Sequence, residues 1–268
     1  MKAKVYSLDG QVKKEIELPK VFNESVRDDL IRRAVHALQT HRLQPKGSYP
    51  LAGLQTSAEY IGRRRAFRSG ATRGISRLPR EKLGGGGLGE VKRVPHAKGG
   101  RRAHPPKVER IIYEKINKKE RKKALASAVA ATGKLELVKE RGHKVDEKKG
   151  LPLIIESGIE TVKKSKDALN VLLALGLAKE LERASEKKIR AGKGKTRGRK
   201  YKRRKGVLVV LSNKEALKAF RNIQGVDAEL VENLNVELLA PGGQAGRLTV
   251  FSENALKKLD KVCGLNGS

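Results

Sequence analysis

The stretch Val207-Leu208-Val209-Val210-Leu211 decides the fold of this chain. It is apolar without interruption, which is typical of a strand that is buried on both faces of a sheet. Such a strand belongs to a parallel sheet with helices packed on both sides, because neither face can be left to solvent. We therefore expect this strand to lie inside a mostly parallel sheet.

The residues after this strand alternate between helical and extended patterns. Periodic apolar residues predict helices, and short apolar runs bounded by turn residues predict strands. Strands that alternate with helices indicate an α/β fold, with a mostly parallel sheet covered by helices on both faces. The expected elements are a helix over 215–222, a strand over 228–231, a helical turn over 234–239, a strand over 248–251, and a final helix that Ser252 caps and that runs to Leu259.

The residues before the strand supply the rest of this domain. Leu151-Pro152-Leu153-Ile154-Ile155 predicts a second buried strand, with the proline near its start. The segments 4–8 and 12–18 alternate around Asp9-Gly10, which is a strong signal for a β-hairpin. Helices are expected over 23–39, capped by Asn23 or Ser25, over 118–131, with a left-handed cap at Gly133, over 166–175, broken by Gly176, and over 177–190.

Residues 45–107 interrupt this domain with a segment that has almost no apolar periodicity. The segment holds 15 Lys or Arg against 3 acids, 6 of the chain's 9 Pro and 12 of its 28 Gly. Such a composition cannot bury enough apolar surface to offset the entropy of ordering the backbone. One interpretation is a disordered basic linker. We favour a long extended basic loop that a polyanion orders, because both of its ends return to a well-patterned domain.

A second run of charge occupies residues 187–205, where 12 of 19 residues are Lys or Arg and none is acidic. We interpret it as a second phosphate-binding loop, and a solvated basic loop is the alternative. The whole chain of 268 residues has a formal net charge of +32 and a pI near 10.4, which favours an anionic partner.

Nucleic acid suits this charge better than a membrane does. The longest apolar run, Val171 to Ala178, is far too short to cross a bilayer, and the N-terminus has no apolar signal segment. Because the chain has 4 Phe, 5 Tyr and no Trp, contacts with phosphates and recognition of shape should dominate over base stacking. Cys263 is the only cysteine, so we expect it to be buried, without a disulfide, in a protein of the reducing cytosol.

An enzyme acting on nucleic acid is the first alternative function, and its signals fail in context. Gly84, Gly86 and Gly89 have the spacing of a dinucleotide-binding loop, but no strand is expected before them and no helix after them. Gly194-Lys195-Thr196 resembles the end of a Walker A loop, but Ile189 stands at the first glycine position. We expect no metal cluster, no cofactor and no catalytic set. The other alternative is a protein that coats nucleic acid in general.

The order of several short motifs resembles the ribosomal protein L-four family of the large subunit, in its archaeal and eukaryotic branch. The match extends over nearly the whole chain, and the missing C-terminal extension is similar to the archaeal type. The motifs that carry it include Tyr6-Ser7-Leu8-Asp9-Gly10, Arg102-Ala103-His104-Pro105-Pro106-Lys107, Arg141-Gly142-His143, Arg197-Gly198-Arg199-Lys200-Tyr201, Leu239-Ala240-Pro241-Gly242-Gly243 and Gly246-Arg247-Leu248-Thr249-Val250-Phe251.

This resemblance implies a structural protein of the cytoplasmic ribosome that binds large-subunit rRNA and aids its assembly. It implies an α/β domain over 1–44 and 108–268, which carries the second basic loop at 187–205. It further implies an RNA-penetrating loop over 45–107, whose tip reaches the polypeptide exit tunnel near another ribosomal protein, L-twenty-two. Other neighbouring large-subunit proteins are expected partners; a membrane and a small-molecule substrate are not.

The candidate RNA-binding residues share a cationic or hydrogen-bonding side chain within the two basic segments. Arginine and lysine neutralise phosphates where RNA helices crowd together, and arginine can bridge two phosphates. In the long segment the candidates are Arg63, Arg64, Arg65, Arg68, Arg73, Arg77, Arg80, Lys82, Lys92, Arg93, Lys98, Arg101, Arg102, His104 and Lys107. In the second they are Lys188, Arg190, Lys193, Lys195, Arg197, Arg199, Lys200, Tyr201, Lys202, Arg203, Arg204 and Lys205. His143 stands among cations, and as a neutral donor or acceptor such a histidine can touch RNA.

Overall fold

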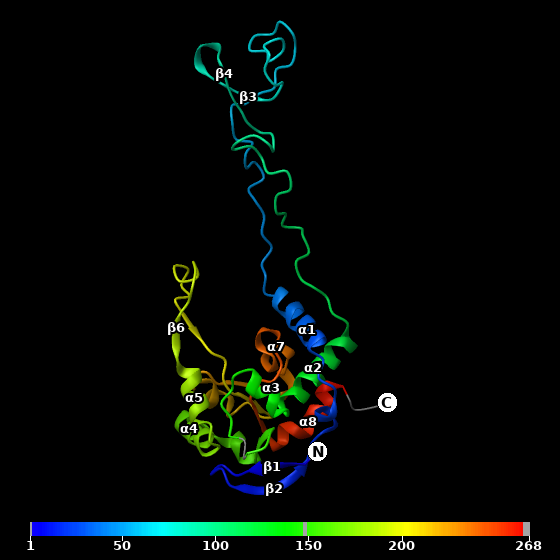
Figure 1. Ribbon diagram of the computed structural model, residues 1–268, viewed down its shortest axis with the longest axis vertical. Coiled ribbons are helices and arrows are strands. Elements are labelled where there is room, and N and C mark those ends of the chain that lie inside the picture. Colours follow the sequence, from blue (N-terminus) through cyan, green and yellow to red (C-terminus); the bar gives the residue numbers. More distant parts are fainter. Residues whose placement is uncertain (1, 147–148, 265–268) are drawn as a thin grey trace. The chain divides into compact units, whose positions relative to one another are not determined.

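The computed structural model describes residues 2–146 and 149–264 of the chain (Figure 1). It divides into two compact units, one formed by Met1–His41 with Tyr113–Ser268 and the other by Arg42–Ile112. We call the first the core unit and the second the insert unit. The segment 45–107 falls within the insert unit.

A six-stranded sheet with the order β2-β1-β5-β10-β8-β9 forms the centre of the core unit. The β1–β2 pair is antiparallel, as expected for the predicted hairpin, and the other pairs are parallel. The predicted mostly parallel sheet is therefore confirmed. The strands are β1 (Lys2–Tyr6), β2 (Val12–Glu17), β5 (Leu153–Ile155), β8 (Leu208–Leu211), β9 (Asp227–Leu230) and β10 (Thr249–Ser252).

The two faces of this sheet carry separate apolar clusters, because side chains alternate along each buried strand. On β8, for example, Leu208 belongs to one cluster and Val209 to the other. Helices supply both clusters, so the sheet is covered on both faces as predicted. The first cluster draws on α1 (Asp28–Thr40), α2 (Lys118–Thr132), α7 (Val236–Leu239) and α8 (Glu253–Cys263), and the second draws on α3 (Leu135–Glu140), α4 (Ser165–Ala174), α5 (Ala178–Ser185) and α6 (Leu217–Arg221).

Three helix ends differ from the sequence prediction. Helix α1 begins at Asp28 after a separate 3-10 turn at Lys20–Asn23, so the expected caps at Asn23 or Ser25 are wrong. The hydroxyl of Ser127 instead accepts a hydrogen bond of 2.6 Å from the backbone N–H that precedes α1. Gly133 has φ −84° and is not left-handed. Helix α5 ends at Ser185 rather than near 190, because the next residues form a strand.

The final helix agrees with its predicted cap. The hydroxyl of Ser252 accepts a hydrogen bond of 3.1 Å from the backbone N–H of Ala255. The helix continues past Leu259 to Cys263 and ends at Gly264, whose φ of 74° is left-handed. Cys263 is buried as expected, and burial together with the nearby Asp260 carboxylate raises the pKa of its thiol to about 12. The thiol therefore stays protonated at neutral pH.

The insert unit contains a short hairpin that the sequence did not reveal. Strands β3 (Arg80–Lys82) and β4 (Leu88–Val91) pair antiparallel around the glycine run, and two chain segments lie side by side below them (Figure 1). The backbone N–H of Ser48, for example, donates to the carbonyl of Pro106 across 3.3 Å. The expectation that no strand precedes Gly84 was thus wrong. A strand rather than a helix follows, however, so the arrangement is not that of a dinucleotide-binding loop.

Candidate nucleic-acid interface

The basic run at 187–205 forms a β-hairpin rather than the expected loop. Strands β6 (Lys187–Ile189) and β7 (Tyr201–Arg203) pair antiparallel, and the hairpin extends from the end of α5 (Figure 1). Arg190 continues the ladder, since its backbone N–H donates to the carbonyl of Lys200 across 2.8 Å and its Nε donates to the carbonyl of Arg199 across 2.9 Å. The backbone N–H of Arg199 closes the tip by donating to the carbonyl of Gly194 at 3.0 Å. The cations of this segment therefore lie on a two-stranded hairpin with a regular backbone.

Most of the hairpin's cations are exposed and have no acidic partner. Within the described residues, no cation between 190 and 203 lies in an ion pair. Acids approach only where the hairpin joins the core unit: Glu186 lies 3.9 Å from both Lys188 and Arg204, and Asp227 lies 2.8 Å from Lys205. Of the hairpin candidates, only Arg190 is half-buried. The outer hairpin is thus a strip of uncompensated positive charge.

A buried ionic cluster holds the base of this hairpin. The Glu180 carboxylate, which is fully buried, accepts hydrogen bonds from Arg183 Nη2 at 2.6 Å and Nε at 2.8 Å. It lies 2.7 Å from Nδ1 of the buried His143 and accepts the backbone N–H of Lys144 at 3.0 Å. Arg183 Nη2 also donates to the carbonyl of Lys205 at 3.0 Å. One guanidinium therefore joins the helix that leads into the hairpin to the segment that follows it.

The protonation states in this cluster follow from burial and contact. Burial alone would raise the pKa of Glu180, but the hydrogen bonds from Arg183, His143 and the Lys144 backbone outweigh it and lower the pKa to about 2. Burial lowers the pKa of His143 more than the neighbouring carboxylate raises it, so the imidazole is neutral at pH 7. The ring of His143 is buried inside the core unit, so it is not available for a contact with RNA.

A second ionic group fixes the strand that leaves the hairpin. Arg247, which is completely buried, donates to the carbonyls of Gly206 at 2.9 Å and Leu238 at 2.8 Å and lies 2.6 Å from the Asp227 carboxylate. Burial would raise the pKa of Asp227, but Arg247 and Lys205 lower it below its ordinary value. Gly206 is required here, since a Cβ at this position would lie 2.7 Å from the Cβ of Ala184. Both legs of the hairpin are therefore anchored in the core.

Some of the insert-unit candidates contact the local fold and most are exposed, and Lys82 and Arg93 do both. Arg68 Nη2 donates to the carbonyl of Leu83 at 2.9 Å, and Arg80 Nη2 donates to the hydroxyl of Ser76 at 3.0 Å. Lys82 pairs with Glu59, and Lys92 lies 2.8 Å from Glu90. Arg93 Nε also reaches the carbonyl of Leu54 at 3.4 Å. The exposed members are Arg63, Arg64, Arg65, Arg73, Arg77, Lys82, Arg93, Lys98, Arg101, Arg102, His104 and Lys107.

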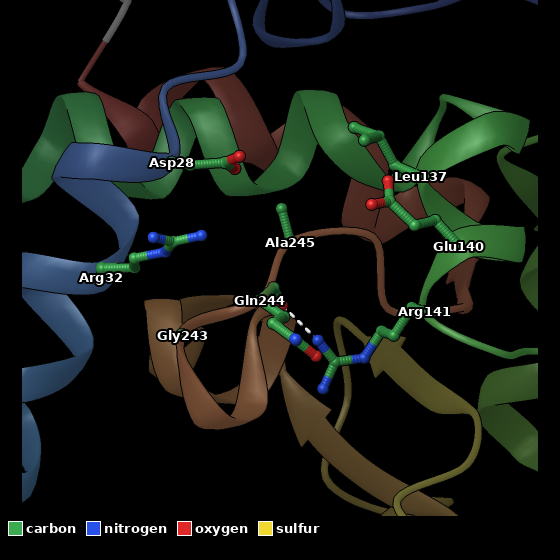
Figure 2. A pocket seen from close by; sticks show the side chains of 8 residues that line it. All are labelled: Asp28, Arg32, Leu137, Glu140, Arg141, Gly243, Gln244 and Ala245. Carbon is green, nitrogen blue, oxygen red and sulfur yellow. Dashed lines mark hydrogen bonds between the residues drawn. The ribbon is translucent and has the colours of Figure 1, made fainter.

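Two motifs that lie far apart in the sequence meet at a small pocket of the core unit. Figure 2 shows the Arg141 side chain reaching the loop that contains Gly243 and Gln244. Its guanidinium donates to the carbonyl of Pro241 at 2.7 Å and to the carbonyl of Gln244. Burial, with the nearby Arg247 and Arg183, lowers the pKa of Arg141 to about 10. Arg141 therefore acts as an internal support for this loop.

The rest of this pocket has mixed charge. Its volume is about 180 Å³, and Asp28 and Glu140 line it together with Arg32 and Arg141 (Figure 2). Two carboxylates next to two guanidinium groups do not make a site selective for phosphate. The described residues also contain no group of three or more His, Cys, Asp or Glu side chains that could hold a metal ion. Among the described helices, none is long and apolar enough to cross a membrane.

Sequence reasoning did not identify Arg183, Glu180 or Arg141 as residues that position the interface. A signal for the first two was present, since Glu180 and Arg183 stand three residues apart on one helix, the spacing of a helical ion pair. Arg141 and the loop at 241–244 are distant in sequence, so no local pattern could connect them. The candidates in the hairpin were selected as a group by composition and remain a prediction, and their arrangement on two strands was not expected.

Comparison with known proteins supports one family. The ribosomal protein L4/L1 family matches residues 16–262. The chain is 53% identical over 261 residues to the large ribosomal subunit protein uL4 of Methanocaldococcus jannaschii, covering 97% of this chain and 98% of that protein. It is 49% identical over 264 residues to the protein of the same name from Nanoarchaeum equitans, covering 97% of each. The protein of this name from Methanosphaera stadtmanae is 47% identical over 269 residues, covering 100% of this chain and 99% of that protein.

The first prediction concerns the cluster at the hairpin base. Glu180→Gln leaves the Arg183 guanidinium without its carboxylate, so the free energy of unfolding at pH 7 should fall by about 3 kcal/mol. Since the pKa of Glu180 is about 2 in the folded chain and ordinarily 4.5, its contribution is present above pH 4.5 and is lost as the pH falls toward 2. The difference between parent and variant, measured by urea unfolding, should therefore shrink over that range.

Glu182→Gln is the matched control, because Glu182 is exposed on the same helix and the substitution changes the net charge equally. Its free energy of unfolding should stay within about 0.5 kcal/mol of the parent value. Amide hydrogen exchange of Arg190 should accelerate in Glu180→Gln and not in the control. Equal effects of the two substitutions on both measurements would contradict the anchoring role of Glu180.

The second prediction concerns Arg141. Arg141→Met removes the two hydrogen bonds to the carbonyls of Pro241 and Gln244, so the free energy of unfolding should fall by about 2 kcal/mol. Arg32→Met is the control, since Arg32 is exposed and lines the same pocket. Its effect should stay within about 0.5 kcal/mol. A loss of RNA affinity without a loss of stability in Arg141→Met would instead identify Arg141 as an RNA contact.

Proposed function

The chain belongs to the ribosomal protein L4/L1 family, and from this premise we propose that it binds large-subunit rRNA and aids the folding of that RNA during assembly. The relatives bear the names of large ribosomal subunit proteins, so the family is not one of enzymes. The role of the chain is structural, and its partners are rRNA and neighbouring proteins of the cytoplasmic ribosome.

The hairpin at 187–205 is the observation that carries this proposal. It holds 12 cations and no acid, and its outer part has no ion pair among the described residues. A surface of this kind gains free energy when phosphates displace their condensed counterions. Because the hairpin is anchored on both legs by buried ion pairs, its cations approach RNA in a fixed arrangement. Less ordering entropy is then lost on binding than for a free basic tail.

The insert unit is proposed to penetrate folded rRNA through its exposed arginines. Arg63, Arg64 and Arg65 lie on one chain segment and Arg101 and Arg102 on the other, so both segments carry phosphate-binding side chains. Between them, the glycine run at 84–87 lets backbones approach closely. By resemblance to its family, the tip of this unit reaches the polypeptide exit tunnel near the ribosomal protein L-twenty-two.

A protein that coats nucleic acid in general is the competing function, since exposed cations bind any phosphate backbone. The two functions differ in selectivity. A constituent of the large subunit should prefer folded rRNA to duplex DNA at the same salt concentration, whereas a coating protein should not. Competition between an rRNA fragment and duplex DNA therefore separates them.

We expect the affinity for rRNA to depend steeply on salt. If about 8 phosphates are neutralised, a plot of log affinity against log salt should have a slope near −7. Replacing Arg199, Lys200, Lys202 and Arg203 together with Gln should reduce the magnitude of the slope by roughly half, because each is a candidate phosphate contact. Filter binding across a salt series measures both slopes.

The matched control replaces four exposed lysines of the core unit outside the hairpin with Gln, which removes the same charge. They are Lys218, Lys257, Lys258 and Lys261. The slope of this control should stay close to that of the parent. A slope near zero for the parent, or the same reduction in both variants, would contradict phosphate binding by the hairpin.

A separate measurement tests the place of the protein in the ribosome. The protein should co-sediment with large subunits after a high-salt wash, because a chain that penetrates folded rRNA cannot exchange freely. The hairpin variant should be depleted from these subunits relative to the lysine control. Release of the parent protein by the wash would count against a role inside the subunit.

A further inference from the structure

The two faces of the basic hairpin differ in chemistry. The pairs along its strands are Lys187 with Arg203, Lys188 with Lys202, and Ile189 with Tyr201. Because alternate residues of a strand point to opposite faces, the Lys188–Lys202 pair lies on one face and the other two pairs lie on the opposite face. One face is therefore purely cationic, whereas the other carries an aliphatic side chain next to an aromatic ring.

The Ile189–Tyr201 pair is open to solvent. Ile189 is 66% exposed and Tyr201 is 53% exposed, and neither belongs to an apolar cluster of the described chain. Cross-strand pairs of this type stabilise hairpins. Stabilisation of the hairpin does not require the outer face of this pair to be uncovered. The pair also stands out because the rest of the segment consists of Lys, Arg, Gly and small residues. This face therefore has the properties of a contact surface.

Cations surround the ring without covering it closely. Lys187 Nζ lies 5.9 Å and Lys200 Nζ 5.7 Å from the centroid of the Tyr201 ring. Both distances are near the outer limit of a cation–π contact, so the two ammonium groups are loosely held. A planar group that stacks on the ring takes the place of a loosely held ammonium group over it, and both lysines stay close enough to neutralise the phosphates on either side of that group.

We propose that Tyr201, backed by Ile189, is a stacking site for one unpaired nucleobase of RNA. Bases inside a helix are already stacked, and side chains cannot read the deep, narrow major groove of A-form RNA, so only a bulged or single-stranded base can reach the ring. Stacking gives affinity with little dependence on base identity, while Lys187 and Lys200 bind the flanking phosphates. The inference rests on the proposed RNA-binding function and names the ligand of this part of the site.

The absence of tryptophan from the chain makes a direct test available. Tyr201→Trp places a single tryptophan at the proposed site and keeps an aromatic face. The probes are an RNA duplex with one bulged adenine and the same duplex without the bulge. Stacking should quench the tryptophan fluorescence with the bulged duplex and much less with the fully paired one. The two RNAs differ by a single phosphate, so electrostatic binding alone predicts nearly equal signals.

Affinity measurements on the natural residue complete the test. The parent chain should bind the bulged duplex roughly ten-fold more tightly than the paired duplex, the preference that one stacked base supplies. Tyr201→Leu should abolish this preference and keep the salt dependence, whereas Tyr201→Phe should keep both. Tyr113→Leu is the control, because Tyr113 is also exposed and has Lys115 Nζ 5.9 Å from its ring centroid but lies outside the hairpin. It should keep the preference.

The outcomes separate this inference from the proposed function. Salt-dependent binding of both duplexes with equal affinity, or equal quenching by both, would overturn the stacking site and leave the phosphate-binding function standing. A preference that survives in Tyr201→Leu would also overturn it, provided that Arg190 amide exchange shows an intact hairpin. Binding of neither duplex by the parent would overturn the proposed function together with the stacking site.

Discussion

Repulsion between like charges is the constraint on which the basic hairpin depends. Twelve cations within 187–205 favour an open chain, and the short strands β6 and β7 bury almost nothing that could oppose this tendency. A two-stranded hairpin without a core is only marginally stable in water. The ion pairs that oppose this repulsion lie outside the hairpin, where the Glu180 and Asp227 carboxylates face Arg183 and Arg247 inside the core unit. Because these pairs join backbone on both legs, the hairpin is held at its base rather than along its length.

Arginine has two opposite uses in this chain, and its immediate partners distinguish them. Arg247 and Arg141 donate to backbone carbonyls, so their guanidinium groups interact within the protein. Arg197 and Arg203 are exposed and have no ion pair among the described residues, so their charge remains for a polyanion. Composition and net charge do not separate these uses, since all four residues count equally toward the total of +32. Only the surroundings of each guanidinium group distinguish the two uses.

The sequence predicted the sheet better than it predicted the basic segments, for a physical reason. The apolar run at 207–211 and the alternation around it reflect burial, which leaves a periodic pattern, and β8, β10, α4 and α8 were found close to their predicted positions. The strands of the hairpin at 187–205 and of the β3–β4 pair are joined by backbone hydrogen bonds and bury few apolar side chains, so they leave no apolar period in the sequence. Helix α3, at Leu135–Glu140, is too short to show a clear period. The contacts that anchor the hairpin link His143 with Glu180 and Asp227 with Arg247, and a local sequence pattern does not reveal such distant pairings.

The order of strands in the sheet also determines when the sheet can be completed during synthesis of the chain. Strand β10, at Thr249–Ser252, lies between β5 and β8 and pairs with both, although it comes after the other strands of the described residues. A chain that emerges from its N-terminus therefore cannot complete the centre of its sheet until β10 has been translated. Until then, the apolar strands β5 and β8 lack their common neighbour, while both cationic segments have already been synthesised. The nascent chain thus exposes apolar strands and two cationic segments at the same time, until β10 is made and covers the strands.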